Sequence, residues 1–190
     1  MRRLCLVRHG PTHAKTMVGW SDLPADLSDH DAIARLAEHL PADALVISSD
    51  LSRAVATADA IQGARTRLPH DPDLREMNFG DWELQRFDEV EDQETYRAFW
   101  EHPGDVKPPN GESWHELEAR VGKAVDAALA AHPDKDLIVV AHFGAILTQL
   151  QRSEKLTAYE AFGHKIDNLS VTEIDITKTG WHTKAINHTP

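Results

Sequence analysis

The stretch "LCLVRHGPTH", residues 4–13, places an apolar run directly before two chemically capable side chains. Residues 4–7 are all apolar, with no polar residue between them, which is typical of a strand buried on both faces. A Gly-Pro pair then breaks the regular backbone. The pattern predicts a central strand that presents Arg8 and His9 at its end.

Two later runs, "ALVI" at 44–47 and "LIVV" at 137–140, repeat this arrangement, and each precedes a helical periodicity. Alternation of apolar strands with helices favours a mostly parallel sheet covered on both faces. We therefore predict an α/β fold, a three-layer α/β/α sandwich with a mostly parallel central sheet. The alternating segment 169–176 is expected to add a strand, and 181–187 to pair with it as an antiparallel edge.

Helix boundaries are indicated by capping residues. Ser28 is the expected cap of a helix whose buried face carries Ile33, Leu36, Ala37 and Leu40. Ser49 or Asp50 is expected to cap the helical segment "LSRAVATADAIQ", and Gly63 to close it.

Further along the chain, Ser113 and Glu116 form an S-x-x-E capping box before a long amphipathic segment. A short apolar helix is expected over 145–150. The region at about 69–110 is rich in structure-breaking and acidic residues, and we interpret it as an insertion of loops and short helices over the sheet edge. Such excursions often shape a substrate pocket.

Composition limits the class of protein. A chain of 190 residues with 41% hydrophobic residues fits one domain, residues 1–190. The formal net charge of −11 argues against nucleic-acid or anionic-membrane partners, which need a basic face. No apolar run approaches the roughly 18 residues of a membrane span. With one cysteine, Cys5, placed in an apolar strand, we expect a cytoplasmic protein without a disulfide.

Three predicted strands end in side chains that can bind an anion. The first ends at Arg8 and His9, the second is followed by Arg53 one turn into the next helix, and the third ends before His142. Ligands of open α/β sheets bind outside the carboxyl ends of the strands. Two arginines and two histidines are therefore expected to converge there, beside the free N–H groups of a helix N-terminus.

A resemblance to a known family follows from five segments in order: "LVRHGPT", "SSDLSRAVATA", "LREMNFGDWE", "PNGESWHELEARV" and "VAHFG". Together they resemble the successive motifs of the histidine phosphatase (phosphoglycerate mutase-like) superfamily, over roughly residues 4–175. The resemblance implies a phosphoglycerate mutase-like fold and a phosphatase that hydrolyses a phosphate monoester of a small metabolite. R-H-G alone is a weak signal, but all five motifs in order are specific.

Roles follow from the resemblance residue by residue. His9 matches the nucleophile that becomes phosphohistidine, and Glu76 matches the proton donor to the leaving group. The phosphate pocket is matched by Arg8, Thr12, Arg53 and His142.

The chemistry is consistent with these roles. Arginine is always charged and binds two phosphate oxygens at once. A histidine nucleophile must be neutral at its attacking nitrogen, and a carboxylic acid can protonate a leaving oxygen and then activate water. We expect no cofactor and no metal, because arginines and histidines supply the stabilising charge.

Several alternatives stay open. Asp81 and Glu83 are rivals of Glu76 as the acid, and Glu112 is a further candidate that helix capping explains almost as well. The 12 histidines raise the possibility of a metal site, but a Gly-Pro break separates His9 from His13, and no H-E-x-x-H motif or cysteine pair exists.

The chain departs from the family pattern at three positions that bear on substrate. Lys15 stands where asparagine is usual, Phe143 where glycine is common, and Leu84 where glycine would follow "WE". Lys15 and Phe143 are therefore possible substrate-binding residues. A phosphoglycerate-type mutase, an α-ribazole phosphate phosphatase, a phosphohistidine-protein phosphatase and a non-catalytic phosphate-binding protein remain as alternatives, and the oligomeric state is unknown.

Overall fold

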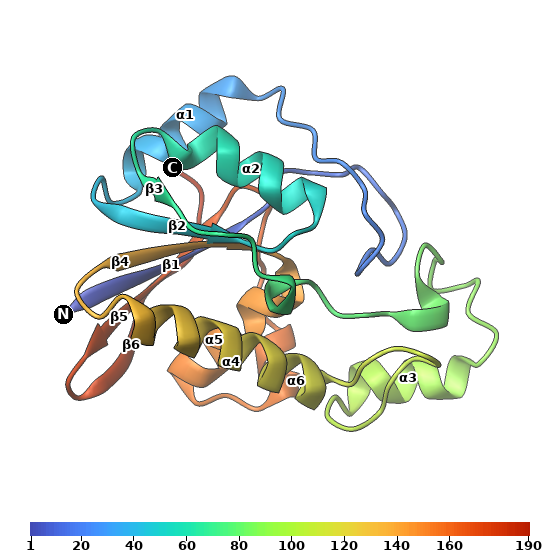
Figure 1. The fold of residues 1–190 in the computed structure, drawn as a ribbon. Coiled ribbons are helices and arrows are strands. Elements are labelled where there is room, and N and C mark those ends of the chain that lie inside the picture. The colour runs from blue at the N-terminus through green and yellow to red at the C-terminus, as the bar shows by residue number, and fades with distance from the viewer.

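A six-stranded sheet in the order β3-β2-β4-β1-β5-β6 forms the middle layer of the computed structural model, which describes residues 1–190 (Figure 1). The strands are β1 (Arg2–Arg8), β2 (Ala44–Ser48), β3 (Thr66–Arg67), β4 (Asp136–Ala141), β5 (Val171–Thr177) and β6 (Gly180–His188). Strands β3, β2, β4 and β1 run parallel to one another, whereas β5 runs antiparallel to β1 and β6 antiparallel to β5. The mostly parallel sheet and the antiparallel edge are as predicted.

Helices cover both faces of the sheet, which confirms the three-layer prediction. In Figure 1, α1 (His30–His39) and α2 (Ser52–Gln62) lie above the sheet, and α4 (Trp114–Ala131), α5 (Phe143–Glu154) and α6 (Ala158–Phe162) lie below it. The predicted helix at 145–150 is thus the middle of a longer one. No helix is both long and apolar enough to span a membrane.

The apolar run of β1 explains why both faces must be covered. Leu4 and Leu6 belong to a core shared with α4 and α5, whereas Cys5 and Val7 belong to a second core shared with α1 and α2. Successive side chains of a strand point to opposite faces, so four consecutive apolar residues supply both cores. Cys5 is fully buried, and this burial raises the pKa of its thiol to about 12, as expected for a packing residue.

Two of the predicted caps are wrong. The first helix begins after Asp29, whose carboxylate accepts the N–H of Ala32 at 3.0 Å, and not after Ser28. Helix α2 begins after Leu51 with no cap from its own side chain, and its Ser52 N–H is bound by the Asp22 carboxylate at 2.7 Å, from a distant loop.

The reason is that Ser49 and Asp50 have tertiary partners. Ser49 contacts His142, and Asp50 forms a bidentate ion pair with Arg75, at 2.6 Å to each oxygen. The predicted cap of α4 is confirmed, because Ser113 and Glu116 form the reciprocal capping box. Gly63 ends α2 as predicted, with a φ of 56°.

Residues 69–110 leave the sheet and return to it. They contain two short 3₁₀ helices, η1 (Pro72–Leu74) and η2 (Gly80–Trp82), and helix α3 (Gln93–Glu101). Figure 1 shows the segment beyond the sheet, at the end where β2 leads into α2. Edge-to-face aromatic pairs hold it together, among them Trp82 with Phe99 and Phe99 with Trp100.

The cap of α1 gives a first prediction. Asp29→Ala should lower the free energy of unfolding by about 1 kcal/mol, since a lost N-cap typically costs ~0.5–2 kcal/mol. Ser28→Ala, one residue earlier, is the matched control and should change it by less than about 0.5 kcal/mol. Urea unfolding followed by circular dichroism would measure both, and equal losses would contradict the cap at Asp29.

Candidate active site

His9 follows β1 directly and is 6% exposed. Its Nδ1 lies 2.7 Å from the carbonyl oxygen of Gly10. A carbonyl only accepts hydrogen bonds, so Nδ1 carries the proton and Nε2 carries the lone pair. The imidazole is thus fixed in the tautomer in which Nε2 can act as a nucleophile.

Arg53 reaches His9 from the first turn of α2. Its Nε lies 3.3 Å from His9 Nε2, and its two terminal nitrogens donate to the carbonyls of Ser21 and Gly19 at 2.7 and 2.6 Å. The side chain is 1% exposed. The guanidinium is therefore held by the 19–21 loop with one N–H directed at the nucleophilic nitrogen.

His142, at the end of β4, lies across from His9 with the ring centroids 5.1 Å apart. Its Nε2 is 2.7 Å from the hydroxyl of Ser49, and its Nδ1 is buried without a partner. A serine hydroxyl can donate to a ring nitrogen or accept from it, so this contact serves either tautomer of the neutral ring. Nδ1 is the ring nitrogen that remains for a ligand.

Arg8 completes the cationic part of the cluster. Its Nη1 donates to the carbonyl of Ile166 at 2.5 Å, and its Nε is buried without a partner. The guanidinium lies 5.4 Å from the centre of the Phe143 ring. Arg8 and His142 thus each keep one buried side-chain nitrogen without a partner.

Glu76 supplies a buried carboxyl group, 7% exposed. One oxygen accepts the N–H of Met77 at 2.9 Å, and the other accepts the N–H of Gly144 at 3.0 Å, at the start of α5. A Cβ on Gly144 would lie 2.5 Å from the Glu76 carboxylate. Only glycine therefore allows this close approach of the helix N-terminus to the acid.

Burial drives the pKa values of the acid and the histidines in opposite directions. Desolvation raises the pKa of Glu76 against the opposing effects of the two backbone N–H groups that it accepts and of the charges of Arg53 and Arg8. Burial, with the charges of Arg53 and Arg8, lowers the pKa of His9 to about 3, and burial holds the pKa of His142 well below its usual value. The site thus combines neutral imidazoles with a carboxyl group that tends to keep its proton.

The rivals of Glu76 have other partners. Glu83 accepts four N–H groups, from Gly19, Trp20, Ser21 and Phe79, and also the hydroxyl of Ser21. Asp81 is exposed and accepts from the Asn110 amide. Glu112 pairs with Arg120 and accepts the N–H of Asn78 at 3.2 Å, and it takes no part in the capping box of α4. Glu83 and Glu112 thus each connect segments that are distant in the sequence: Glu83 holds the 19–21 loop, and Glu112 holds Asn78 and Arg120.

Three other predicted residues lie in the loop after β1 or beside it. Thr12 is partly buried, and its hydroxyl accepts the N–H of Ala14 at 3.4 Å. Lys15 is exposed. His13 pairs with Asp26 at 2.7 Å and makes no contact with His9. No group of three or more His, Cys, Asp or Glu side chains is arranged to hold a metal ion.

Four contributing residues were not predicted as site residues. Ser49 contacts Nε2 of His142 at 2.7 Å, and the Asn168 amide donates to the carbonyl of His9 at 2.9 Å. Trp20 and Arg120 both donate to the carbonyl of Glu76, at 2.8 and 3.0 Å. Only Ser49 gave a usable signal, because it follows a parallel strand at its carboxyl end.

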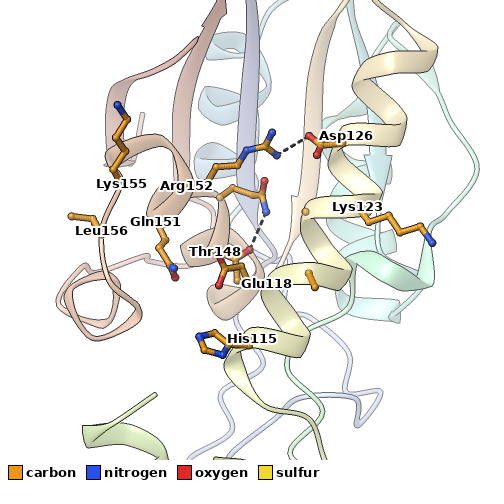
Figure 2. A pocket seen from close by; sticks show the side chains of 12 residues that line it. His115, Glu118, Lys123, Asp126, Thr148, Gln151, Arg152, Lys155 and Leu156 are labelled. Atoms are coloured by element: carbon orange, nitrogen blue, oxygen red, sulfur yellow. Dashed lines mark hydrogen bonds and ion pairs between the residues drawn. The ribbon is translucent and has the colours of Figure 1, made fainter. Parts of the chain in front are cut away.

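Two hollows differ in character. A small cavity of about 30 Å³ adjoins Glu76 and is lined by seven hydrophobic residues, Met77, Phe79, Phe99, Trp100, Trp114, Phe143 and Phe162. A larger groove of about 770 Å³ lies between α4 and α5 and is lined mostly by polar and charged side chains, including Glu118, Lys123, Asp126 and Arg152 (Figure 2). The groove contains none of the clustered residues described above, whereas the cavity shares Glu76 with them.

The chain belongs to the histidine phosphatase superfamily (branch 1), whose family model matches residues 4–189. All five sequence motifs lie within these residues, which confirms the predicted resemblance.

Individual relatives are similar at moderate identity. An adenosylcobalamin/alpha-ribazole phosphatase of Salmonella typhimurium is 29% identical, with 97% of this chain and 96% of the relative covered. A probable phosphoglycerate mutase GpmB of Proteus mirabilis is 30% identical, with 95% and 88% covered. The structure of Bacillus stearothermophilus YhfR superposes with a TM-score of 0.90 at 26% identity, with 100% and 98% covered.

The buried histidines give a second prediction. Their folded pKa values lie below the unfolded value of about 6.5, so the unfolded chain binds more protons as pH falls below it. The stability that they contribute is present above about pH 6.5 and is lost toward the folded pKa, which for His9 is about 3. Each proton contributes a slope of up to ~1.4 kcal/mol per pH unit.

His142→Asn should therefore flatten the fall of unfolding free energy between about pH 6.5 and about pH 5, measured by urea unfolding. Glu76, whose pKa is raised, makes stability depend on pH with the opposite sign. It is present in both the wild type and His142→Asn, so its contribution cancels when the two profiles are compared. His102→Asn, at an exposed histidine, is the control and should leave the profile unchanged. An unaltered profile in His142→Asn would contradict a buried neutral ring.

Proposed function

We propose that this protein hydrolyses a phosphate monoester through a phosphohistidine intermediate on His9. The observation that carries the proposal is the pairing of a buried His9, with its Nε2 lone pair directed at Arg53, with a buried carboxyl group at Glu76 that tends to keep its proton. Family membership and the similarity to a named phosphatase support it.

The first part of the mechanism is binding. A phosphate monoester is a dianion and repels a nucleophile until its charge is neutralised. Arg8 and Arg53 provide the positive charge, and Arg8 Nε–H is a buried donor without another partner. The unpartnered Nδ1 of His142 adds a second donor in the tautomer that carries its proton there. The phosphoryl group replaces His9 as the partner of Arg53 Nε, and Thr12 supplies a hydroxyl at the rim.

The second part is transfer. The Nε2 lone pair of His9 attacks phosphorus while the bond from phosphorus to the ester oxygen breaks. Glu76 gives its proton to that oxygen, so that the alcohol leaves neutral and Glu76 becomes a carboxylate. The Nδ1–H bond to the Gly10 carbonyl stabilises the positive charge that develops on the ring.

Hydrolysis restores the site. The Glu76 carboxylate takes a proton from water, whose oxygen attacks the phosphohistidine, and inorganic phosphate leaves with the bond to Nε2 broken. His9 is neutral again and Glu76 is protonated again. All the charge stabilisation comes from the chain itself, so the steps require no cofactor.

The substrate we propose is a small phosphorylated metabolite met in the cytoplasm. The aromatic cavity beside Glu76 is lined from the 69–110 insertion by Phe79, Phe99 and Trp100 and from α5 by Phe143, which supports a pocket that this insertion shapes on the leaving-group side. The exposed Lys15 can meet only the outer part of a substrate.

A mutase is the second candidate, because a relative of similar identity is a probable phosphoglycerate mutase. A mutase must keep water away from its phosphohistidine until the product rebinds. Inorganic phosphate released from 3-phosphoglycerate or from an aryl phosphate, without isomerisation, is expected for a phosphatase, whereas 2-phosphoglycerate formation would favour the mutase.

His9→Ala tests the nucleophile. Turnover of 4-nitrophenyl phosphate should fall to the background rate, because no other side chain offers a lone pair at this place, while the fold survives the loss of one side chain at a strand end. Circular dichroism and activity would be measured on the same sample, with the exposed His102→Ala as a control that keeps full activity. Substantial activity in a folded His9→Ala protein would reject the assignment.

Glu76→Gln tests the acid. It keeps the size of the side chain and removes the titrating proton, so it should slow an alkyl phosphate far more than a nitrophenyl phosphate, whose leaving group needs no proton. General acid catalysis contributes roughly 10²–10⁴-fold, so the contrast should be large. The comparison uses the rate of phosphoryl transfer in a single turnover, because loss of the same carboxylate would also slow dephosphorylation. Equal slowing of both substrates would show that Glu76 is not the acid.

A further inference from the structure

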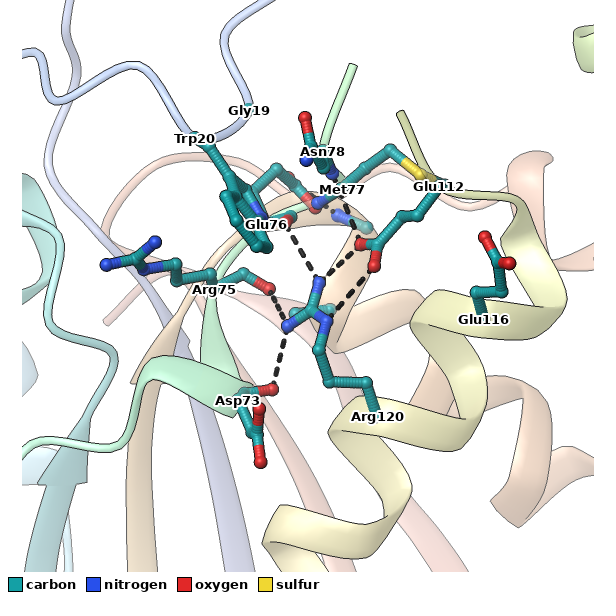
Figure 3. A network of polar contacts seen from close by, with 12 residues as sticks. Gly19, Trp20, Asp73, Arg75, Glu76, Met77, Asn78, Glu112, Glu116 and Arg120 are labelled. Atoms are coloured by element: carbon teal, nitrogen blue, oxygen red, sulfur yellow. Dashed lines mark hydrogen bonds and ion pairs between the residues drawn. The ribbon is translucent and has the colours of Figure 1, made fainter. Parts of the chain in front are cut away.

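We propose that Arg120 is a positioning residue that holds Glu76 where it can protonate the leaving group. The inference rests on the proposed function and adds to it a side chain outside the phosphate pocket. Arg120 lies on α4 and extends toward the segment that carries Glu76, as Figure 3 shows. Its side chain is 15% exposed.

The guanidinium binds the backbone of this segment at three points. Its Nη1 donates to the carbonyls of Asp73 and Arg75 at 2.8 and 3.0 Å, and its Nη2 donates to the carbonyl of Glu76 at 3.0 Å. Residues 75–79 have no regular secondary structure. Because no helix or strand fixes this backbone, a planar side chain with several donors can take over that role.

Glu112 fixes the guanidinium itself. Its carboxylate accepts from Arg120 Nε at 3.2 Å and from Nη2 at 2.5 Å, and it also accepts the N–H of Asn78 at 3.2 Å. The N–H of Glu112 in turn donates to the carbonyl of Asn78 at 2.9 Å. The ion pair therefore holds the chain both before and after Glu76.

Trp20 connects this network to the phosphate side. Its indole N–H donates to the same Glu76 carbonyl at 2.8 Å, and the guanidinium carbons of Arg75 and Arg120 lie 4.9 and 5.9 Å from the centre of its ring. Neighbouring Gly19 accepts from Arg53. The backbone of the acid is thus tied to the loop that orients the phosphate-binding arginine.

The carboxyl group depends on this backbone. It is bound only by the N–H groups of Met77 and Gly144, and Gly144 belongs to a different element, α5. A shift of the 75–77 backbone would move the acid away from α5 and from the leaving oxygen. Catalytic groups tolerate misplacement of only about 0.5 Å, so loss of Arg120 should impair proton donation specifically.

Arg120→Met tests this, since it keeps the aliphatic length and removes every donor. We expect single-turnover transfer from an alkyl phosphate to fall about 10-fold or more, part of the roughly 10²–10⁴-fold that an acid supplies, and transfer from 4-nitrophenyl phosphate to fall by less than about threefold. Inhibition by inorganic phosphate should stay within about threefold, because the anion pocket keeps its arginines. Lys123→Met, at an exposed residue one turn along α4, is the matched control.

Two further variants separate positioning from simple loss of structure. In the Glu76→Gln background, Arg120→Met should cause no additional loss with the alkyl phosphate, because the proton it positions is already absent. Glu112→Gln keeps Arg120 but weakens the ion pair that anchors it. It should also slow transfer from the alkyl phosphate more than transfer from the aryl phosphate, but by a smaller factor than Arg120→Met. Glu112→Gln can be read even where Arg120→Met unfolds, because it leaves Arg120 in place.

Equal losses for alkyl and aryl phosphates in folded Arg120→Met and Glu112→Gln, or full additivity with Glu76→Gln, would overturn the inference alone. Wild-type protein that cleaves neither substrate, or a His9→Ala protein that still cleaves the aryl phosphate, would overturn the proposed function and this inference with it.

Discussion

The buried guanidinium of Arg53 is the interaction on which the site depends. Its three bonded nitrogens face His9 and two carbonyls of the 19–21 loop, so one side chain holds both the His9 ring and a segment without regular structure. A buried cation is stable only when its donors are satisfied. The position of the 19–21 loop is therefore set by Arg53. The Glu83 carboxylate also holds this loop, by accepting the N–H groups of Gly19 and Trp20.

The exclusion of water from the site shifts the pKa values of both His9 and Glu76. Removing solvent penalises every charge, so it lowers the pKa of His9 and raises the pKa of Glu76. The positive charges of Arg8 and Arg53 lower the pKa of both residues, so they add to the effect of burial at His9 and oppose it at Glu76. Burial is the larger influence at both residues. One physical cause, burial, thus shifts the pKa of His9 and that of Glu76.

Much of this could be predicted from the sequence, because the relevant residues stand directly at strand ends. Four consecutive apolar residues before Arg8 indicated a strand buried on both faces, and parallel strands place their ends together. The caps at Ser49 and Asp50 were wrong because local rules do not register distant partners, here His142 and Arg75. The role of Arg120 was inaccessible for the same reason, since it lies 44 residues from Glu76 in the chain.

The neighbours Phe143 and Gly144 have opposite freedom to vary. Any side chain at 144 would collide with the Glu76 carboxylate, so a change there disturbs the acid itself. The Phe143 ring lines the aromatic cavity and is partly exposed, so exchanging it would reshape the cavity and leave the bonds of the acid intact. A substitution at 144 would thus alter the surroundings of the carboxyl group, whereas one at 143 would alter only the shape of the cavity beside it.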